Sequence, residues 1–218
     1  MRYRLVVFDM DGTILDTLED LTDSVNYALG CLGFPIRSKQ EVCGFVGNGI
    51  RKLIEQAVPK GTEKVLTDRV YQVFREYYRG HCAEKTQPYS GILPLLEELR
   101  RAGRKTAVVS NKADFAVQEL CSRYFNGLFD TAVGEREGIL RKPAPDSVYE
   151  VLRRLGVAKE EAVYIGDSDV DIETARNVGM DEIAVEWGFR TREFLEEKGA
   201  KRIVSLPAQI AEIVLRGR

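Results

Sequence analysis

The sequence predicts an α/β protein: a doubly wound (Rossmann-like) parallel sheet core with a small α-helical cap domain inserted after the first strand. Apolar runs rich in β-branched residues recur without polar alternation, which is typical of strands buried on both faces. Helical patterns alternate with these runs, and strands that alternate with helices form parallel sheets. The predicted strands are residues 4–8, 105–109, 129–133, 162–166 and 182–186.

The helices of the core are predicted from apolar periodicity and from glycines that follow it. The first of them ends at Gly103 and the last at Gly179, as expected for helix C-termini. Their predicted ranges are 92–102, 113–124, 145–155 and 170–178.

The interval between the first two strands is helical in pattern, with breaks at residues 33–35, 44–49 and 59–61. An insertion that leaves the first strand at its carboxyl end lies over the ligand site of an open α/β sheet, so we expect it to act as a lid. We therefore predict a core of residues 1–16 and 84–218 and a helical cap of residues 17–83. The helical patterns of the cap are 17–32, 49–58 and 63–80.

Charge and composition favour a small-molecule partner. The 32 Lys plus Arg residues nearly balance 34 Asp plus Glu, which gives a net charge of −2, and no long basic run indicates nucleic acid or an anionic membrane. No membrane-length apolar stretch and no signal-peptide pattern occur, so we expect a cytoplasmic protein, as a monomer or a homodimer. The four cysteines form no CxxC pair, and the single histidine, His81, lacks partners for zinc or triad chemistry.

The first chemical motif is Asp9 and Asp11 in the stretch VVFDMDGTILD, residues 6–16. An Asp-Gly turn after a strand is one interpretation. The alternative is a site, because Asp9 follows a buried strand and Gly12 lets the backbone turn Asp11 toward the same pocket. Two such carboxylates ionise together only with a cation between them, or one keeps a proton. One acid would then bind a metal and act as nucleophile, and the other would serve as general acid and base.

The second motif is GDSDVD, residues 166–171, at the end of the fourth predicted strand. An EF-hand is excluded because Ile172 stands where that calcium loop requires glycine and Val178 where it requires glutamate. An acidic helix N-terminus accounts for one aspartate better than for three. If the fourth strand lies beside the first, Asp167 and Asp9 converge on one hard cation, for which Mg²⁺ fits best.

Two further motifs follow strands or precede helices. In VVSNKAD, residues 108–114, Ser110 or Asn111 forms either an ordinary helix cap or a cradle for an oxyanion or phosphate. In RKPAPD, residues 141–146, Lys142 is either a solvated surface residue or a catalytic one.

Together, DMDGT, the serine of VVSN, the lysine of RKP and GDSDVD resemble, in order, the four motifs of the haloacid dehalogenase-like phosphatase superfamily. The resemblance spans nearly the whole chain, and GFVGNGIRKLIEQAV with VEWGFRT is similar to the phosphoglycolate phosphatase branch. It implies a magnesium-dependent phosphatase that hydrolyses the phosphate monoester of a small phosphorylated metabolite through an aspartyl phosphate.

The resemblance also implies a role for each motif residue. Asp9 would be the nucleophile and a magnesium ligand, and Asp11 the general acid and base, with its backbone carbonyl on the metal. Asp167 would be the remaining ligand, and Asp171 would orient the metal shell. The phosphoryl group would be held by Ser110 and Lys142 and supported by Thr13 and Asn111.

The cap loop GNGIRKL suggests a substrate-binding segment, Gly47, Asn48, Gly49 and Arg51. One interpretation is an ordinary surface loop with a solvated arginine and no role in binding. In the functional one, the glycines let the loop close, and backbone amides or Arg51 meet the anionic end of a substrate such as phosphoglycolate.

Three rival functions remain at this point. A phospho-receiver domain also gathers aspartates, a hydroxyl residue and a lysine around magnesium, but receivers run to about 120 residues and have no lid. A sugar-phosphate mutase and a pyrophosphatase share the proposed fold and motifs. An assay of products separates them from a phosphatase.

Overall fold

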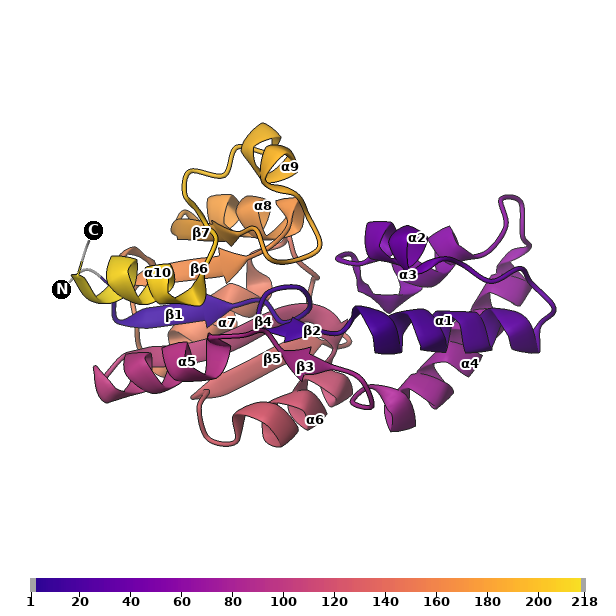
Figure 1. Ribbon diagram of the computed structural model, residues 1–218, viewed down its shortest axis with the longest axis horizontal. Coiled ribbons are helices and arrows are strands. Elements are labelled where there is room, and N and C mark those ends of the chain that lie inside the picture. The colour runs from indigo at the N-terminus through magenta and orange to yellow at the C-terminus, as the bar shows by residue number, and fades with distance from the viewer. Residues whose placement is uncertain (1–2, 217–218) are drawn as a thin grey trace.

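The core of the protein is a six-stranded sheet in the order β5-β4-β1-β6-β7-β8, in which every neighbouring pair is parallel (Figure 1). The computed structural model describes residues 3–216. Strand β1 lies in the middle, and the chain winds outward from it in both directions, which confirms the predicted doubly wound sheet. The strands are β1 (Leu5–Phe8), β4 (Lys105–Ala113), β5 (Thr131–Glu135), β6 (Ala162–Gly166), β7 (Asp181–Val185) and β8 (Ile203–Val204).

Both faces of β1 are covered, which explains its continuous apolar sequence. Side chains alternate across a strand, so Leu5 and Val7 pack with helices α7 and α8, while Val6 and Phe8 pack with α5, α6 and α10. All four side chains are fully buried, and each such burial contributes roughly 1.5–3 kcal/mol. The bounds are α5 (Ile92–Arg101), α6 (Asp114–Phe125), α7 (Asp146–Leu155), α8 (Asp169–Val178) and α10 (Pro207–Ala211).

Four helices form the cap beyond the carboxyl ends of the strands (Figure 1). Three match the predicted patterns. The fourth, α2, was not predicted, although its capping box of Ser38 and Glu41 is visible in the sequence: Glu41 N donates to Ser38 Oγ at 3.2 Å and Ser38 N to Glu41 Oε2 at 2.8 Å. The helices are α1 (Leu18–Cys31), α2 (Lys39–Phe45), α3 (Gly49–Ala57) and α4 (Lys64–His81).

The two connections between core and cap lie side by side as an antiparallel pair, β2 (Leu15–Asp16) and β3 (Gln87–Pro88). The buried carboxylate of Asp20, in the first turn of α1, accepts the backbone N–H of Lys85 and Thr86 at 3.0 and 2.8 Å. It also accepts the Thr86 hydroxyl at 2.7 Å. Charge-assisted bonds of this kind fix the two connections to each other.

Several short elements, one just before β6 and the others beyond β7, were not predicted from sequence, because two- to six-residue segments carry too little periodicity. They are β8, α9 (Arg192–Glu197), α10, the 3₁₀ turn η1 (Lys159–Glu161) and the π-helical turn η2 (Glu212–Arg216). Within residues 3–216, no helix combines the length and apolarity needed to cross a membrane.

Candidate active site

Three buried aspartates meet where β1 and β6 end. Asp9 directly follows β1 and Asp167 directly follows β6, and the pairing of Phe8 with Ile165 places the two strand ends side by side. Asp171 comes from the first turn of α8. Carboxylate oxygens of Asp9, Asp167 and Asp171 lie within 4.8 Å of one another. The predicted convergence of Asp9 and Asp167 required their two strands to be neighbours, and β1 and β6 are neighbours in the sheet.

Burial and repulsion from neighbouring carboxylates raise the pKa values of Asp9 and Asp167. Burial raises the pKa of Asp9 to about 7, and the neighbouring charges of Asp171 and Asp11 act in the same direction against Lys142. Burial also raises the pKa of Asp167 to about 8, and repulsion from Asp171 and Asp9 adds to it. The cluster therefore does not hold its full negative charge near neutral pH without a further cation.

Lys142 is the cation that faces this cluster. Its Nζ lies 3.0 Å from Asp9 Oδ1 and 2.7 Å from Asp171 Oδ1, and it donates to the Tyr164 hydroxyl at 3.0 Å. Burial opposes its charge, but the two carboxylates hold the pKa of Lys142 well above its usual value. With 4% of its surface exposed, Lys142 is not the solvated lysine that the sequence left open.

The donor set fits a hard divalent cation. Asp9 Oδ1 is buried and, apart from its ion pair with Lys142, makes no hydrogen bond of good geometry within the described residues. A Cβ at Gly12, where φ is +81°, would lie 2.3 Å from Asp167 Oδ2, and one at Gly188 would lie 2.4 Å from Asp167 Cβ. These two glycines keep space for the Asp167 carboxylate. Carboxylate oxygens with room for water suit Mg²⁺.

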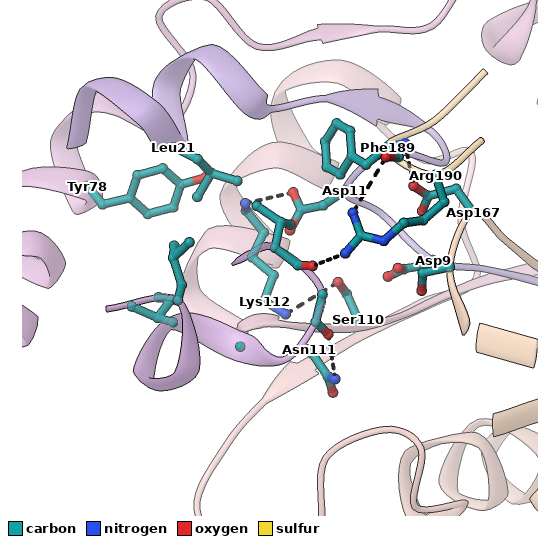
Figure 2. A pocket seen from close by; sticks show the side chains of 16 residues that line it. Asp9, Asp11, Leu21, Tyr78, Ser110, Asn111, Lys112, Asp167, Phe189 and Arg190 are labelled. Carbon is teal, nitrogen blue, oxygen red and sulfur yellow. Dashed lines mark hydrogen bonds and ion pairs between the residues drawn. The ribbon is translucent and has the colours of Figure 1, made fainter. Parts of the chain in front are cut away.

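Asp11 faces away from this cluster and toward the cap (Figure 2). Its Oδ1 accepts the Thr17 hydroxyl at 2.7 Å and the Lys112 ammonium at 2.8 Å. The carboxylate lines the same pocket as Asp9 and is partly exposed. The two acids of the first motif thus occupy different environments, as different chemical roles require.

In the motif VVSNKAD, Ser110 and Asn111 both line the pocket, and Asn111 also joins three segments of the chain. The Asn111 amide donates to Gly47 O and to Lys142 O, both at 3.0 Å, and its Oδ1 accepts Lys142 N at 2.8 Å. Thr13 is also engaged, because its hydroxyl donates to Asp167 Oδ1 at 3.1 Å. These bonds hold the loops that carry Lys142 and Asp167 in place.

The cap loop after α2 is fastened to the core through three successive backbone carbonyls. Val46 O accepts from Arg190 Nη2 at 2.8 Å, Gly47 O from Asn111, and Asn48 O from Arg141 Nη1 at 3.2 Å. The donors come from three separate core segments. The structure therefore shows the cap closed over the strand ends.

The structure brings only part of the predicted cap segment to the pocket. Gly47 and Gly49 line it, but the side chain of Asn48 is exposed. Arg51 pairs with Asp68 on α4 and lies over the Tyr71 ring, with Cζ 4.0 Å from the ring centroid. Because α3 presents Ile50 and Leu53 to the pocket instead, Arg51 is not among the residues that line it.

A family model for haloacid dehalogenase-like hydrolases matches residues 6–185 of the chain. The chain belongs to this family. Among relatives of this haloacid dehalogenase-like chain, a phosphoglycolate phosphatase from Mesorhizobium japonicum is 30% identical over 221 residues, which cover 97% of this chain and 96% of that one. An N-acetylmuramic acid 6-phosphate phosphatase from Pseudomonas aeruginosa is 29% identical over 225 residues, which cover 99% and 96%.

A solved structure, described as that of a candidate phosphoglycolate phosphatase from Lactobacillus delbrueckii subsp. bulgaricus, is 43% identical. It superposes with a TM-score of 0.94 and covers 99% of both chains. These similarities confirm the predicted family and fold, and they identify the chain as a phosphatase of the haloacid dehalogenase-like family, similar to proteins named phosphoglycolate phosphatase.

Nine residues that line the pocket of this haloacid dehalogenase-like protein were not predicted as site residues, and four of them are Tyr78, Lys112, Phe189 and Arg190. Phe189 N donates to Asp167 Oδ2 at 2.7 Å. Of these four, only Lys112 could have been predicted from the sequence. It stands two residues after Ser110, and side chains two residues apart share one face of a strand. The other three reach the pocket through tertiary packing.

The metal-free protein is expected to lose stability as the pH rises from about 4 to about 8. Asp9 and Asp167 have higher pKa values in the folded chain than the value of 3.8 expected when unfolded. Through this window the folded state binds more protons, so the free energy of unfolding falls as pH rises. The contribution is complete below about pH 4 and is lost as the pH rises through about 7 and about 8, the pKa values of the two carboxyl groups in the folded chain.

Denaturant unfolding in EDTA at about pH 5.5 and about pH 8.5 measures this loss, with Asp167→Asn as the comparison. The variant should show a smaller fall, since one of the two shifted groups is removed. Added Mg²⁺ should stabilise the wild type mainly at the higher pH, because ionised carboxylates bind metal. An equal fall in wild type and variant would contradict the assignment.

Proposed function

We propose that the chain is a magnesium-dependent phosphatase that hydrolyses a small phosphate monoester through an aspartyl phosphate, with phosphoglycolate as the substrate. The observation that carries the proposal is that the two aspartates of the first motif lie on opposite sides of one pocket. Asp9, beside Lys142, lies at the strand ends, and Asp11 lies on the cap side. A phosphoryl group between them has a nucleophile on one side and a proton donor on the other.

Asp9 and Asp167 would hold the magnesium ion, with the backbone carbonyl of Asp11, and Asp171 would orient its shell. When bound, Mg²⁺ offsets the negative charge of the phosphoryl group and of the carboxylates around it. Ser110 and Lys142 would bind phosphoryl oxygens. Lys142 already lies 3.0 Å from Asp9, so it can stabilise charge that passes between that carboxylate and the phosphoryl group.

In the first step an Asp9 carboxylate oxygen bonds to phosphorus and the ester P–O bond breaks. Asp11 gives its proton to the leaving oxygen. In the second step Asp11 takes a proton from a water molecule, whose oxygen bonds to phosphorus while the bond to Asp9 breaks. Inorganic phosphate leaves, and both aspartates return to their starting states.

The enclosed space favours a short leaving group. The cavity between core and cap measures about 40 Å³, the room of only three or four water molecules. Apolar cap side chains form much of its wall, among them Leu21, Ile50 and Leu53. A two-carbon alcohol needs less opening of the closed cap than a sugar does.

The proposed division remains a core of residues 1–16 and 84–218 and a cap of 17–83, joined by the β2–β3 pair. The cytoplasmic location and the state of monomer or homodimer also stay predictions.

The proposal is tested by measuring phosphate release with Mg²⁺ from phosphoglycolate, N-acetylmuramic acid 6-phosphate, pyrophosphate and hexose phosphates. We expect the highest kcat/KM for phosphoglycolate, with glycolate and inorganic phosphate in equal amounts. A higher value for another compound would overturn the substrate assignment. Isomerised sugar phosphate without inorganic phosphate would identify a mutase.

A further inference from the structure

Lys112 is a buried ammonium to which the proposed reaction gives no part. It is 4% exposed and lines the pocket beside Ser110. In the described part of the chain, Asp11 is the one carboxylate within ion-pair distance of its Nζ, at 2.8 Å. An ammonium has three donors, and a buried cation is most stable when its partners are charged as well. The Lys112 ammonium can therefore donate a further hydrogen bond to a ligand in the pocket.

The place of Lys112 along β4 puts it next to the leaving alcohol. Ser110 and Lys112 lie two residues apart in the part of β4 where the register to β5 shifts, and Ser110 Oγ accepts Lys112 N at 3.3 Å. Asp11, which touches Lys112, is the residue proposed to protonate the leaving oxygen. An alcohol that leaves beside Asp11 must therefore pass within reach of the Lys112 ammonium.

Tyr78 of α4 supplies a second polar group at this point. Its side chain extends from the cap toward Lys112, whose Nζ lies 4.9 Å from the ring centroid (Figure 2). Tyr78 is fully buried, and its hydroxyl makes no hydrogen bond of good geometry within residues 3–216. Burial keeps the phenol protonated by raising its pKa, so it remains a donor. The Lys112 ammonium is the polar group that faces this hydroxyl, so the two side chains form one polar patch in the pocket wall.

The remaining cap wall offers little to a charged group. Leu21, Val46, Ile50 and Leu53 are apolar side chains, and Arg190 is bonded to cap carbonyls. Among the described residues of this wall, an anion on the leaving alcohol would find a charged donor and a hydroxyl donor side by side at Lys112 and Tyr78.

We propose that Lys112 and Tyr78 form a specificity subsite that binds a carboxylate on the leaving alcohol of the substrate. The inference rests on the proposed function for the direction in which the alcohol leaves. The ammonium contributes a charge-assisted hydrogen bond and the phenol a neutral one. The subsite selects short phosphomonoesters with an anionic end over uncharged ones of similar size.

The test compares two ligands that differ at this end, phosphonoacetate and ethylphosphonate. Their Kd values are measured by calorimetry with Mg²⁺, so the result needs no turnover. Wild type should bind phosphonoacetate more tightly. In Lys112→Met that preference should fall about ten- to a hundredfold, and in Tyr78→Phe about two- to tenfold.

Each variant has a matched control that removes the same kind of side chain outside the pocket. Lys52→Met removes an exposed lysine of α3, and Tyr77→Phe removes a hydroxyl one residue before Tyr78 on α4. Both should keep the wild-type preference. The ratio of kcat/KM for phosphoglycolate to that for ethyl phosphate should follow the same pattern across the four variants.

Three binding results would overturn the subsite: equal affinity of wild type for both phosphonates, an unchanged preference in Lys112→Met, or an unchanged preference in Tyr78→Phe. Equal loss of turnover for both esters in Lys112→Met would also overturn it, because the lysine would then act only through Asp11. Failure of the proposed substrate is distinct from these results. In that case wild type would prefer phosphonoacetate yet would not hydrolyse phosphoglycolate.

Discussion

Asp9→Asn is expected to abolish turnover while the chain keeps its fold. The substitution removes the proposed nucleophile and one negative charge at the metal site but changes almost no volume. Loss of one essential group of a covalent mechanism lowers kcat by about four to six orders of magnitude. Stability should not suffer, because a carboxyl group whose pKa burial raises to about 7 is replaced by a neutral amide.

The measurement is phosphate release with Mg²⁺, together with thermal unfolding of the variant. Asp16→Asn, at an exposed position of β2 seven residues away, is the matched control and should retain wild-type turnover. Turnover of Asp9→Asn within about tenfold of wild type would remove Asp9 from the role of nucleophile.

Removal of divalent metal is expected to have an effect as large as that of Asp9→Asn. Carboxylates of Asp9, Asp167 and Asp171 converge within 4.8 Å, and Lys142 alone does not balance them together with a phosphate dianion. EDTA should therefore abolish phosphate release, and excess Mg²⁺ should restore it. Ca²⁺ should bind without restoring activity, because its larger and looser coordination shell suits in-line displacement poorly.

Metal binding itself is followed by calorimetric titration of Mg²⁺ into the metal-free protein. Asp167→Asn should weaken binding at least about tenfold. Asp169→Asn, two residues away in the same motif and outside the cluster, should not. Full phosphate release in excess EDTA would contradict a metal-dependent reaction.

The sequence was sufficient for the sheet and the motif order, because both depend on local pattern. Runs such as residues 4–8 are buried on both faces, so they stay apolar throughout. Alternation of strands with helices permits the first and fourth predicted strands to be neighbours, and the convergence of Asp9 with Asp167 was predicted on that condition. The pairing of Phe8 with Ile165 meets the condition.

The sequence also determined little about short elements. Strand β5 begins at Thr131 and not at residue 129, and at Asp130 it is the side-chain carboxylate that accepts Thr106 N, at 2.8 Å. Such a bond joins residues 24 positions apart, and no periodicity indicates it.

Only the tertiary structure decided which charged side chains face the pocket. Arg51 follows the glycines of the cap loop and Lys112 follows Ser110, but Arg51 turns to Tyr71 and Asp68 on α4 and does not line the pocket. Lys142 is an ordinary lysine by sequence, and it becomes a buried partner of Asp9 because the loop after β5 folds back over β1 and β6. The groups that bury a side chain and the charges beside it come from segments distant in the chain. The pattern within each segment therefore determines the fold, whereas the packing between segments determines the chemistry of the site.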